Sequence, residues 1–377
     1  CEVSACQVTV GGTVMFDLSE LFTAIAAGDV GQVESLMDKY PKRSMDEPCW
    51  SNGGKLALIE ATLAGNVDII NVLIKGGCDV NVRTSTGETA LHTAVQSKDL
   101  NPVVVKLLVD HGADPNIQDN LWGHTPLHVL ARHFTSHKTS SELSALLSAW
   151  SLLVAKCNVN KPTKRRSTAL HRLTTTSIES LEPLKILVEA GADLDFQTEA
   201  GDTPLMQAVE ANCQSVVELL VDKKADTSKT NRYQETALHI AARLNRVSIV
   251  KALVRSPSCD VNCQDLDGNT PLHLAGGKGY LEVVKRILMH SNVDPNIEND
   301  AGMTPLHVAV DSGFPKVVRC LLECEKINLL VLTKSHQTPL DLAQQEYRFR
   351  SHPEISRILI NAMDKLSISS KVVEECL

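Results

Sequence analysis

The sequence predicts an all-α solenoid of helix-turn-helix units joined by β-hairpin-like loops, because one signature recurs along the chain. Its clearest copy, Asp265–Asn299, contains Thr-Pro-Leu-His, a short apolar helix pattern, a glycine break, a second helix pattern and an Asp-x-Asn exit. A period of about 33 residues is typical of stacked repeats, which bury their apolar faces only against neighbours. One slot of the signature recurs at intervals of 36, 43, 35, 33, 34, 34 and 34 residues: His92, His128, His171, Met206, His239, His273, His307 and Asp341.

Each part of the Asp265–Asn299 unit has a physical role. Thr270 can cap the first helix, and Pro271 follows it in the first turn, where its missing N–H removes no helical hydrogen bond. Leu272 and Ala275 lie three residues apart on one helix face, and Gly279 ends this helix. A buried stripe on the second helix is predicted at i, i+3, i+6 and i+7: Leu281, Val284, Ile287 and Leu288.

The units follow one another along nearly the whole chain. Residues 1–16 alternate weakly and carry Gly11-Gly12, which predicts a short extended lead-in. The first unit departs from the signature, as a terminal capping repeat is expected to, and the second keeps only part of it. The predicted units cover 17–47, 54–84, 85–119, 120–160, 164–197, 198–230, 231–264, 265–298, 299–332 and 333–364.

Two insertions and a tail interrupt the regular period. The fourth unit carries a polar, Ser/Thr-rich segment at 132–141, which we expect to be an exposed loop between its two helices. The tenth unit carries a second insertion at 346–352. Residues 365–377 form a polar tail, which we expect to be disordered or to belong to a further segment. Because the chain starts at Cys1 and not at Met, we expect it to be a piece of a longer protein.

The composition favours a stack of small-residue helices. Aromatic residues make up only 3% of the chain, and the net charge of −8 gives no sign of a general nucleic-acid binder. Eleven cysteines are scattered without a framework spacing, which favours reduced thiols and therefore a cytoplasmic location, with the nucleus as a further compartment. No apolar run approaches the roughly 18 residues that a membrane helix needs, so we expect no membrane insertion.

The residues that could support chemistry are better explained by the repeat. Six of the thirteen histidines occupy the Thr-x-Leu-His slot, where each imidazole is expected to bond the neighbouring backbone and Thr side chain. The His133–His137 spacing lacks accompanying Cys or carboxylate ligands, and the Cys259–Cys263 and Cys320–Cys324 pairs stand alone. Gly276–Gly279 lacks the preceding strand and the Ser or Thr of a phosphate loop. We therefore expect no enzyme, no metal site and no cofactor.

The Thr-Pro-Leu-His turn, the glycine break and the Asp-x-Asn exit resemble those of the ankyrin-repeat family over residues 17–364. The resemblance implies a partner-binding surface made of the hairpin tips and the inner face of each first helix, where residues are free of core packing. These positions give the candidate binding residues Leu121, Trp122, His124, Glu199, Glu210, Arg232, Tyr233, Glu235, Arg243, Leu266, Lys278, Asp300, Met303 and Asp311.

Two of these features have more than one interpretation. Trp122 is costly to leave in water at a turn tip, and Trp, Tyr and Arg are the residue types that dominate interface energetics. Trp122 can instead pack on an adjacent basic or inserted loop. The basic run Lys164–Arg166 is either a nuclear-import or acidic-partner patch, or a solvated loop between repeats.

An asparagine recurs in the exit turn, where we expect it to tie the turn to the neighbouring repeat by side-chain hydrogen bonds. The family resemblance implies that this asparagine can be hydroxylated. The candidates are Asn81, Asn116 and Asn296, of which Asn81 fits the pattern best.

The sequence thus leads to a non-catalytic scaffold or adaptor, a monomeric array that binds a protein partner on its concave face. We expect neither a small-molecule substrate nor direct nucleic-acid binding. The alternative is the recognition arm of a larger protein whose effector domain lies outside this chain, such as a ubiquitin-ligase adaptor, a Rel/NF-kappa-B-type inhibitor, a channel or a kinase.

Overall fold

A computed structural model describes residues 7–10, 13–16, 18–39, 46–48, 55–134, 139–175, 180–344 and 352–375. The chain divides into two compact units, Cys1–Asp193 and Leu194–Leu377. The insertion predicted at 346–352 lies, apart from its last residue, outside the described residues.

The first unit opens with two short antiparallel strands, β1 (Gln7–Val10) and β2 (Thr13–Phe16), which pair Gln7 with Phe16. Helices then alternate between two layers. The inner layer holds α1 (Ser19–Ala27), α3 (Ala57–Leu63), α5 (Ala90–Gln96), α7 (Pro126–Ala131) and α9 (Ala169–Thr174). The outer layer holds α2 (Val30–Met37), α4 (Val67–Lys75), α6 (Pro102–Asp110), α8 (Ser140–Val154) and α10 (Glu182–Glu189).

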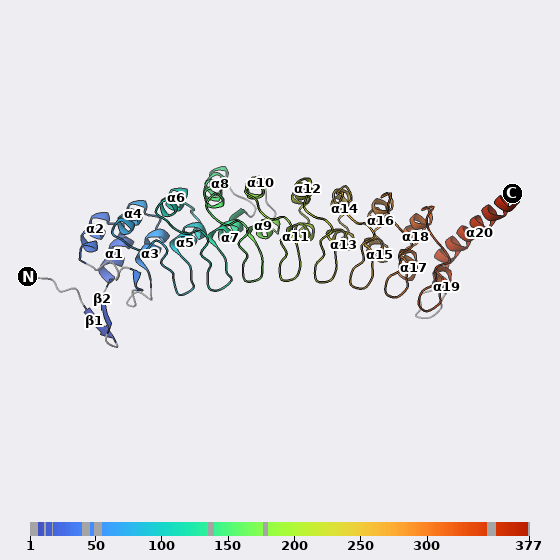
Figure 1. The fold of residues 1–377 in the computed structure, drawn as a ribbon, viewed down its shortest axis with the longest axis horizontal. Coiled ribbons are helices and arrows are strands. Elements are labelled where there is room, and N and C mark those ends of the chain that lie inside the picture. Colours follow the sequence, from blue (N-terminus) through green and yellow to red (C-terminus); the bar gives the residue numbers. More distant parts are fainter. Residues whose placement is uncertain are drawn as a thin grey trace, which may run out of the picture. The chain divides into compact units, whose positions relative to one another are not determined.

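The second unit repeats this two-layer arrangement. Its inner helices are α11 (Pro204–Glu210), α13 (Ala237–Arg243), α15 (Pro271–Gly277), α17 (Pro305–Asp311) and α19 (Pro339–Gln344). Its outer helices are α12 (Gln214–Asp222), α14 (Val247–Leu253), α16 (Leu281–Leu288), α18 (Pro315–Leu322) and α20 (Pro353–Glu375). Within each unit an inner helix contacts the next inner helix and its own outer helix, so every pair is buried by its neighbours (Figure 1).

The Thr-His pair of the signature starts the inner helices. In α15 the Thr270 N–H donates to His273 Nδ1 at 3.0 Å, and the Thr270 hydroxyl lies 2.9 Å from the same nitrogen. Because Nδ1 accepts, the proton lies on Nε2, which donates to the Met303 carbonyl of the next repeat at 2.9 Å. The same Thr–His capping box starts α5, α7, α9, α13 and α17. The structural role predicted for these histidines is confirmed.

The two exceptions at this slot follow the same logic. Asp341 replaces the imidazole, and its carboxylate accepts from the Thr338 N–H at 2.8 Å and from the Thr338 hydroxyl at 2.7 Å. Met206 has no acceptor, so only half of the cap remains there: the Thr203 hydroxyl accepts from the Met206 N–H at 3.3 Å. A side chain at this slot therefore completes the cap only if it can accept a hydrogen bond.

Burial of the slot histidines predicts a loss of stability in mild acid. Burial lowers the pKa of His128 and of His273 to about 4. Between that value and the ordinary pKa of about 6.5, the unfolded chain binds protons that the native state does not. Stability is therefore fully present above pH ~6.5 and falls as the pH drops towards 4. From pH 7 to pH 5 we expect each of the two to reduce the free energy of unfolding by about 2 kcal/mol, as measured by urea denaturation.

A variant at one slot provides the control. His273→Met introduces the residue that position 206 already carries, and it removes one titrating imidazole. The stability difference between pH 7 and pH 5 should be about 2 kcal/mol smaller in this variant than in the wild type. An equal difference in both proteins would show that His273 is not responsible for the acid sensitivity.

The second helix of the Asp265–Asn299 unit corrects the predicted stripe. Val283, Val284 and Ile287 are fully buried, whereas Leu281 and Leu288 are only half-buried. A single stripe was the wrong model because α16 packs on α15 and also between α14 and α18. The buried surface of an outer helix is consequently wider than one i, i+3 row.

The insertion in the fourth unit is partly core, which corrects the exposed loop predicted for residues 132–141. A short 3-10 turn, η3 (Arg132–Phe134), follows α7, and Phe134 is only 5% exposed. Its ring meets that of Trp150 edge-on, with centroids 5.1 Å apart. Ser140 and Ser141 already belong to α8, which Thr139 starts by accepting from the Glu142 N–H.

The chain end also differs from expectation, since α20 continues as a helix to Glu375 and covers most of the tail predicted for residues 365–377. None of the described helices is both long enough and apolar enough to cross a membrane.

Across the described ranges, no disulfide links the cysteines.

Candidate protein-interaction surface

From α4 to α19, exposed hairpins link each outer helix to the next inner helix, and each hairpin is closed by a backbone hydrogen bond of 2.8–3.0 Å. We call the closed segments finger tips. In the first unit they are residues 84–88, 119–124 and 163–167. In the second unit they are residues 198–202, 231–235, 265–269, 299–303 and 333–337. The inner helix, with its capping Thr, follows each tip at once, so the cap that starts an inner helix also fixes the tip.

Neighbouring finger tips are joined to one another by their backbones. In the first unit the Lys164 N–H donates to the Trp122 carbonyl at 2.9 Å. In the second unit the Leu266 N–H donates to the Tyr233 carbonyl at 2.9 Å. Gln264 adds a side-chain bridge, because its amide donates to the Gly268 and Glu298 carbonyls at 2.7 and 2.9 Å. These bonds hold the tip side chains in a fixed register, which the sequence pattern had not indicated.

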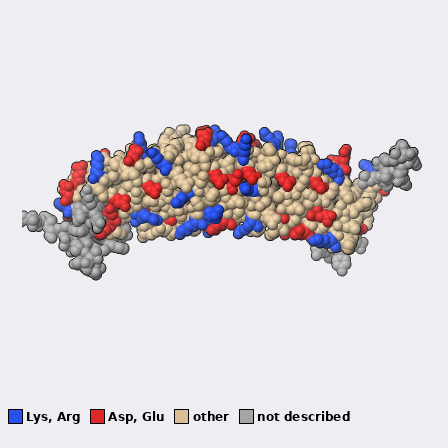
Figure 2. Space-filling view, viewed as in Figure 1, with Lys and Arg blue, Asp and Glu red and all other residues tan. Residues whose placement is uncertain are grey.

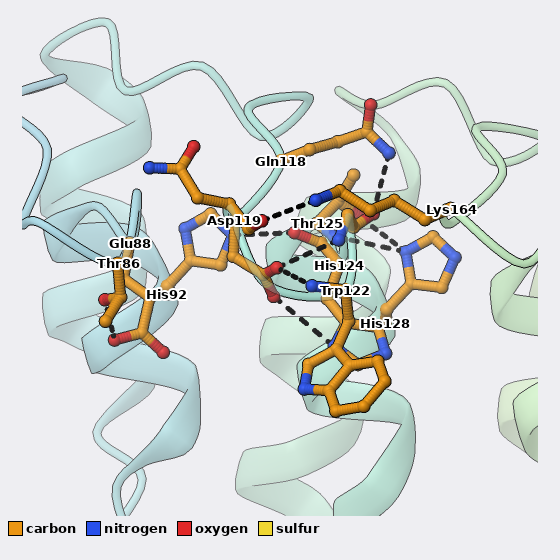
Figure 3. Close-up of polar contacts among 12 residues, drawn as sticks. Thr86, Glu88, His92, Gln118, Asp119, Trp122, His124, Thr125, His128 and Lys164 are labelled. Atoms are coloured by element: carbon orange, nitrogen blue, oxygen red, sulfur yellow. Dashed lines mark hydrogen bonds and ion pairs between the residues drawn. The ribbon is translucent and has the colours of Figure 1, made fainter.

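Asp119 holds the tip that carries the first group of candidates (Figure 3). Its carboxylate accepts from the Trp122 N–H at 2.6 Å and from the Gly123 N–H at 2.9 Å, and it lies 3.3 Å from His124 Nδ1. This tight turn directs the side chains of Leu121 and Trp122 outward, and the two residues are 61% and 53% exposed. His124 is only half-buried, and burial lowers its pKa despite the neighbouring Asp119 carboxylate.

Trp122 combines the two interpretations that the sequence left open. Its indole remains half exposed, and the Arg165 guanidinium of the next finger tip lies 5.6 Å from the ring centroid. This distance allows a cation–π interaction. The packing of Trp122 on the basic connector is therefore confirmed, and it leaves much of the ring in solvent.

Two further arginines that the sequence did not single out lie near this tip. Arg132 follows the last residue of α7, and Arg172 lies in α9, which packs against α7. Burial and the positive charge of Arg132 lower the pKa of Arg172, and both arginines help to lower the pKa of His124. Their closeness depends on the packing of two helices about 40 residues apart, so a motif could not have revealed it.

The second unit holds the remaining candidates. Tyr233 and Leu266 are 52% and 58% exposed at neighbouring tips, and the Arg232 guanidinium lies 5.0 Å from the Tyr233 ring centroid. Glu199 and Asp300 are exposed at their own tips. Met303 is only half-buried, and its carbonyl accepts from His273. These side chains make up the candidate surface of the second unit.

The inner-helix candidates of the second unit share one position. Glu210, Arg243 and Asp311 are the last residues of their helices, and Lys278 follows the last residue of α15. Arg243 pairs with Glu235 at 3.0 Å. Burial and the nearby Asp202 raise the pKa of Glu210, and Figure 2 shows acidic side chains gathered around α11. This surface is therefore acidic, with its arginine already paired.

The exit-turn asparagines join successive repeats, as predicted. Asn81 accepts from the Asp114 N–H at 2.8 Å and donates to the Gly112 carbonyl at 3.1 Å. Asn116 accepts from the Asn158 N–H at 2.7 Å. Asn296 accepts from the Asn328 N–H at 2.7 Å and donates to the Lys326 carbonyl at 2.7 Å. The described residues contain no group of three or more His, Cys, Asp or Glu arranged to hold a metal ion.

Comparison with protein-family models matches one family, "Ankyrin repeats (3 copies)", over most of the chain. The matched residues are 21–119, 58–145, 147–231, 173–265, 227–299 and 272–369. These segments cover both units and include every candidate binding residue named above.

Individual relatives are similar over only part of their length. A B-cell lymphoma 3 protein homolog from Mus musculus is 31% identical over 202 residues, which are 53% of this chain and 43% of that protein. Inversin from Homo sapiens is 28% identical over 253 residues, 66% of this chain and 22% of that protein. Ankyrin repeat and SOCS box protein 6 from Homo sapiens is 29% identical over 224 residues, 54% of this chain and 50% of that protein. The chain thus matches half or less of each of these relatives.

Proposed function

Because the chain belongs to the ankyrin-repeat family, we propose that it is a non-catalytic scaffold or adaptor whose finger tips and inner-helix ends bind a protein partner. The observation that carries this proposal is the exposure of large apolar side chains at tips held rigid by backbone bonds. Leu121, Trp122, Tyr233 and Leu266 are each more than half exposed. A fixed surface loses little conformational entropy when a partner binds, and aromatic residues dominate the energy of such contacts.

The electrostatic pattern of the tips supports a protein partner over a small molecule. Each unit pairs an exposed aromatic ring with a stacked arginine, Trp122 with Arg165 and Tyr233 with Arg232. Such pairs present a broad amphipathic surface, whereas small-molecule sites are concave and enclosed.

The proposal includes a monomeric array that is located in the cytoplasm, with the nucleus as a further compartment. Burial raises the pKa of the Cys78 and Cys259 thiols to about 12, which is consistent with thiols that persist unreacted.

A second form of the proposal is that the chain is the recognition arm of a larger protein. Its matches cover 22–50% of the relatives described above, so each of those proteins has further segments. One relative is named for a SOCS box as well as for its ankyrin repeats. Sequencing the complete transcript tests this form directly: a separate effector domain supports it, and a reading frame confined to these repeats contradicts it.

Affinity capture from cell lysate tests the binding surface. We expect the wild-type chain to capture a protein that a Trp122→Ala/Tyr233→Ala variant loses, with partners identified by mass spectrometry. Hot-spot truncation typically costs 2 kcal/mol or more of binding free energy, which corresponds to about a thirty-fold loss of affinity. Both side chains are half exposed, so the melting temperature should change little.

A matched control removes exposed apolar side chains away from the tips. Val103 lies on α6 and Met289 follows α16, and both are more than half exposed. Val103→Ala/Met289→Ala should capture the same protein as the wild type. Equal capture by all three proteins would exclude these tips as the binding surface.

Hydroxylation of Asn81, Asn116 and Asn296 remains a prediction from the family. Each of these side chains is engaged between repeats, so a modifying enzyme would need the local turn to open. Peptide mass spectrometry of the protein from cells would detect the added oxygen, and unmodified peptides at all three sites would contradict the prediction.

A further inference from the structure

The first unit carries positive charge without carboxylate partners at and near the finger tip that holds the exposed Trp122. Arg165 stacks on Trp122, and the Lys164 amide is bonded to the Trp122 carbonyl. Arg132 and Arg172 lie on the packed helices α7 and α9, next to His124 of the same finger tip. Among the described residues, no carboxylate forms an ion pair with Arg132, Arg165 or Arg172. We call these three arginines with Leu121 and Trp122 the Trp122 surface.

The carboxylates nearest to this surface in the finger tips are already engaged. Asp119 is 8% exposed, and it accepts from two backbone N–H groups and lies beside His124. Glu88 accepts from the Thr86 hydroxyl at 3.1 Å (Figure 3). Neither carboxylate forms an ion pair with the three arginines, so their guanidinium groups remain available to an external anion.

The corresponding surface of the second unit has the opposite electrostatic balance. Its tip also stacks an arginine on an aromatic ring, Arg232 on Tyr233. Its inner-helix arginine, however, is paired: Arg243 lies 3.0 Å from Glu235. Glu210 and Asp202 add further negative charge beside this pair. The two units thus carry the same aromatic–arginine pair, but the charged residues near it are mainly basic in the first unit and mainly acidic in the second.

From this contrast we infer that the Trp122 surface binds an acidic peptide segment of a partner protein, in which carboxylates flank an apolar side chain. The carboxylates would pair with Arg132, Arg165 and Arg172, whose planar guanidinium groups suit bidentate contacts. The apolar side chain would cover Leu121 and the exposed part of the Trp122 ring. This inference rests on the proposed function, and it specifies which kind of peptide segment the partner protein would present.

A nucleic acid is the competing anionic occupant, and the charge distribution disfavours it. The chain carries a net charge of −8, and the second-unit surface is acidic. Nucleic-acid binding depends on many phosphate contacts along an extended basic stripe. Arg165 on Trp122, with Arg132 and Arg172 near His124 of the same finger tip, is a small number of cations, which suits a short segment with few charges.

Fluorescence anisotropy with a defined probe tests the inference on the full chain. The probe is a short fluorescein-labelled peptide in which Glu and Asp flank Leu, and its counterpart replaces Glu and Asp by Gln and Asn. We expect the acidic probe to bind more tightly than the amide counterpart, and its affinity to fall with added salt. Arg132→Gln/Arg172→Gln should weaken the acidic probe about ten-fold. Arg165→Gln, at an exposed position that no core packing depends on, should weaken it several-fold.

The matched control is Lys251→Gln/Arg255→Gln, which removes two exposed positive charges in and just after the outer helix α14 of the second unit, away from the finger tips. It should bind the acidic probe as the wild type does. The inference is overturned if the wild type does not distinguish the acidic probe from its amide counterpart, or if the control loses as much affinity as Arg132→Gln/Arg172→Gln. Single-stranded DNA that binds more tightly than the peptide, and displaces it, would also overturn the inference in favour of nucleic acid.

The outcomes separate this inference from the proposed function. If the acidic probe fails while Trp122→Ala/Tyr233→Ala still loses its captured protein, the scaffold proposal stands and only the partner chemistry is wrong. If capture is identical for every variant and the acidic probe also fails, both are wrong.

Discussion

We expect Trp150→Ala to lower the free energy of unfolding by about 3–5 kcal/mol, the usual cost of removing a large buried aromatic side chain. Trp150 is fully buried in α8, and its indole N–H donates to the Pro183 carbonyl of α10 at 3.0 Å. Its ring also meets that of Phe134 edge-on. The substitution would leave a cavity and remove this hydrogen bond at a position where three elements of the first unit meet.

Urea denaturation followed by far-UV circular dichroism measures this loss, and Trp122→Ala is the matched control. The same substitution at the half-exposed Trp122 should change the free energy of unfolding by less than about 1 kcal/mol, because little apolar area is buried there. If the two variants were equally stable, Trp150 would not belong to the core of the first unit.

The second large effect on the free energy of unfolding is expected for Leu272→Ala, which changes the leucine of the Thr-Pro-Leu-His signature itself. Leu272 is 1% exposed in α15, which packs on α13 and α17. Replacing it removes buried methyl groups at the centre of three stacked inner helices, and we expect a loss of about 2–5 kcal/mol in the free energy of unfolding. Because each repeat is stabilised by its neighbours, the loss should reduce the stability of the flanking repeats as well.

Hydrogen exchange followed by mass spectrometry can resolve that spread along the chain. Protection should fall in α13, α15 and α17 of the Leu272→Ala protein, and far less in α5. Leu266→Ala, at a tip leucine that is 58% exposed, is the control and should leave protection near the wild-type level. A Leu272→Ala protein with unchanged protection would contradict the assignment of this leucine to the core.

The regular part of the fold could be predicted because its determinants are local. Thr270, Pro271 and His273 lie within four residues, and they form the predicted cap with no help from distant segments. The Asn81 bridge was likewise expected, since its partners lie one repeat away at a fixed spacing. Where the repeat is broken, prediction failed: Phe134 was assigned to an exposed loop, and only its contact with Trp150 shows why it is buried.

The candidate site was predictable as a set of exposed positions but not as a set of contacts. Leu121, Trp122, Tyr233 and Leu266 are found exposed at tips, as the resemblance implied. Packing of Trp122 on the basic connector was one of two interpretations, and the sequence did not identify Arg165 as the residue involved, because 43 residues and an insertion that breaks the regular period separate the two. The opposite charge balance of the two tip surfaces was not visible either, since it depends on whether an arginine meets Glu235 or another arginine.

The sequence alone determined the repeat, its helix starts and the positions left out of the core, because these follow from short-range hydrogen bonding and hydrophobic period. Only the tertiary structure decided which of those exposed positions act together. Repeats stack through side-chain volumes and through backbone bonds between tips, such as that from Lys164 to Trp122. A hydrophobic pattern identifies the buried face of each helix, but it does not specify which charged residues of adjacent repeats come to share one surface.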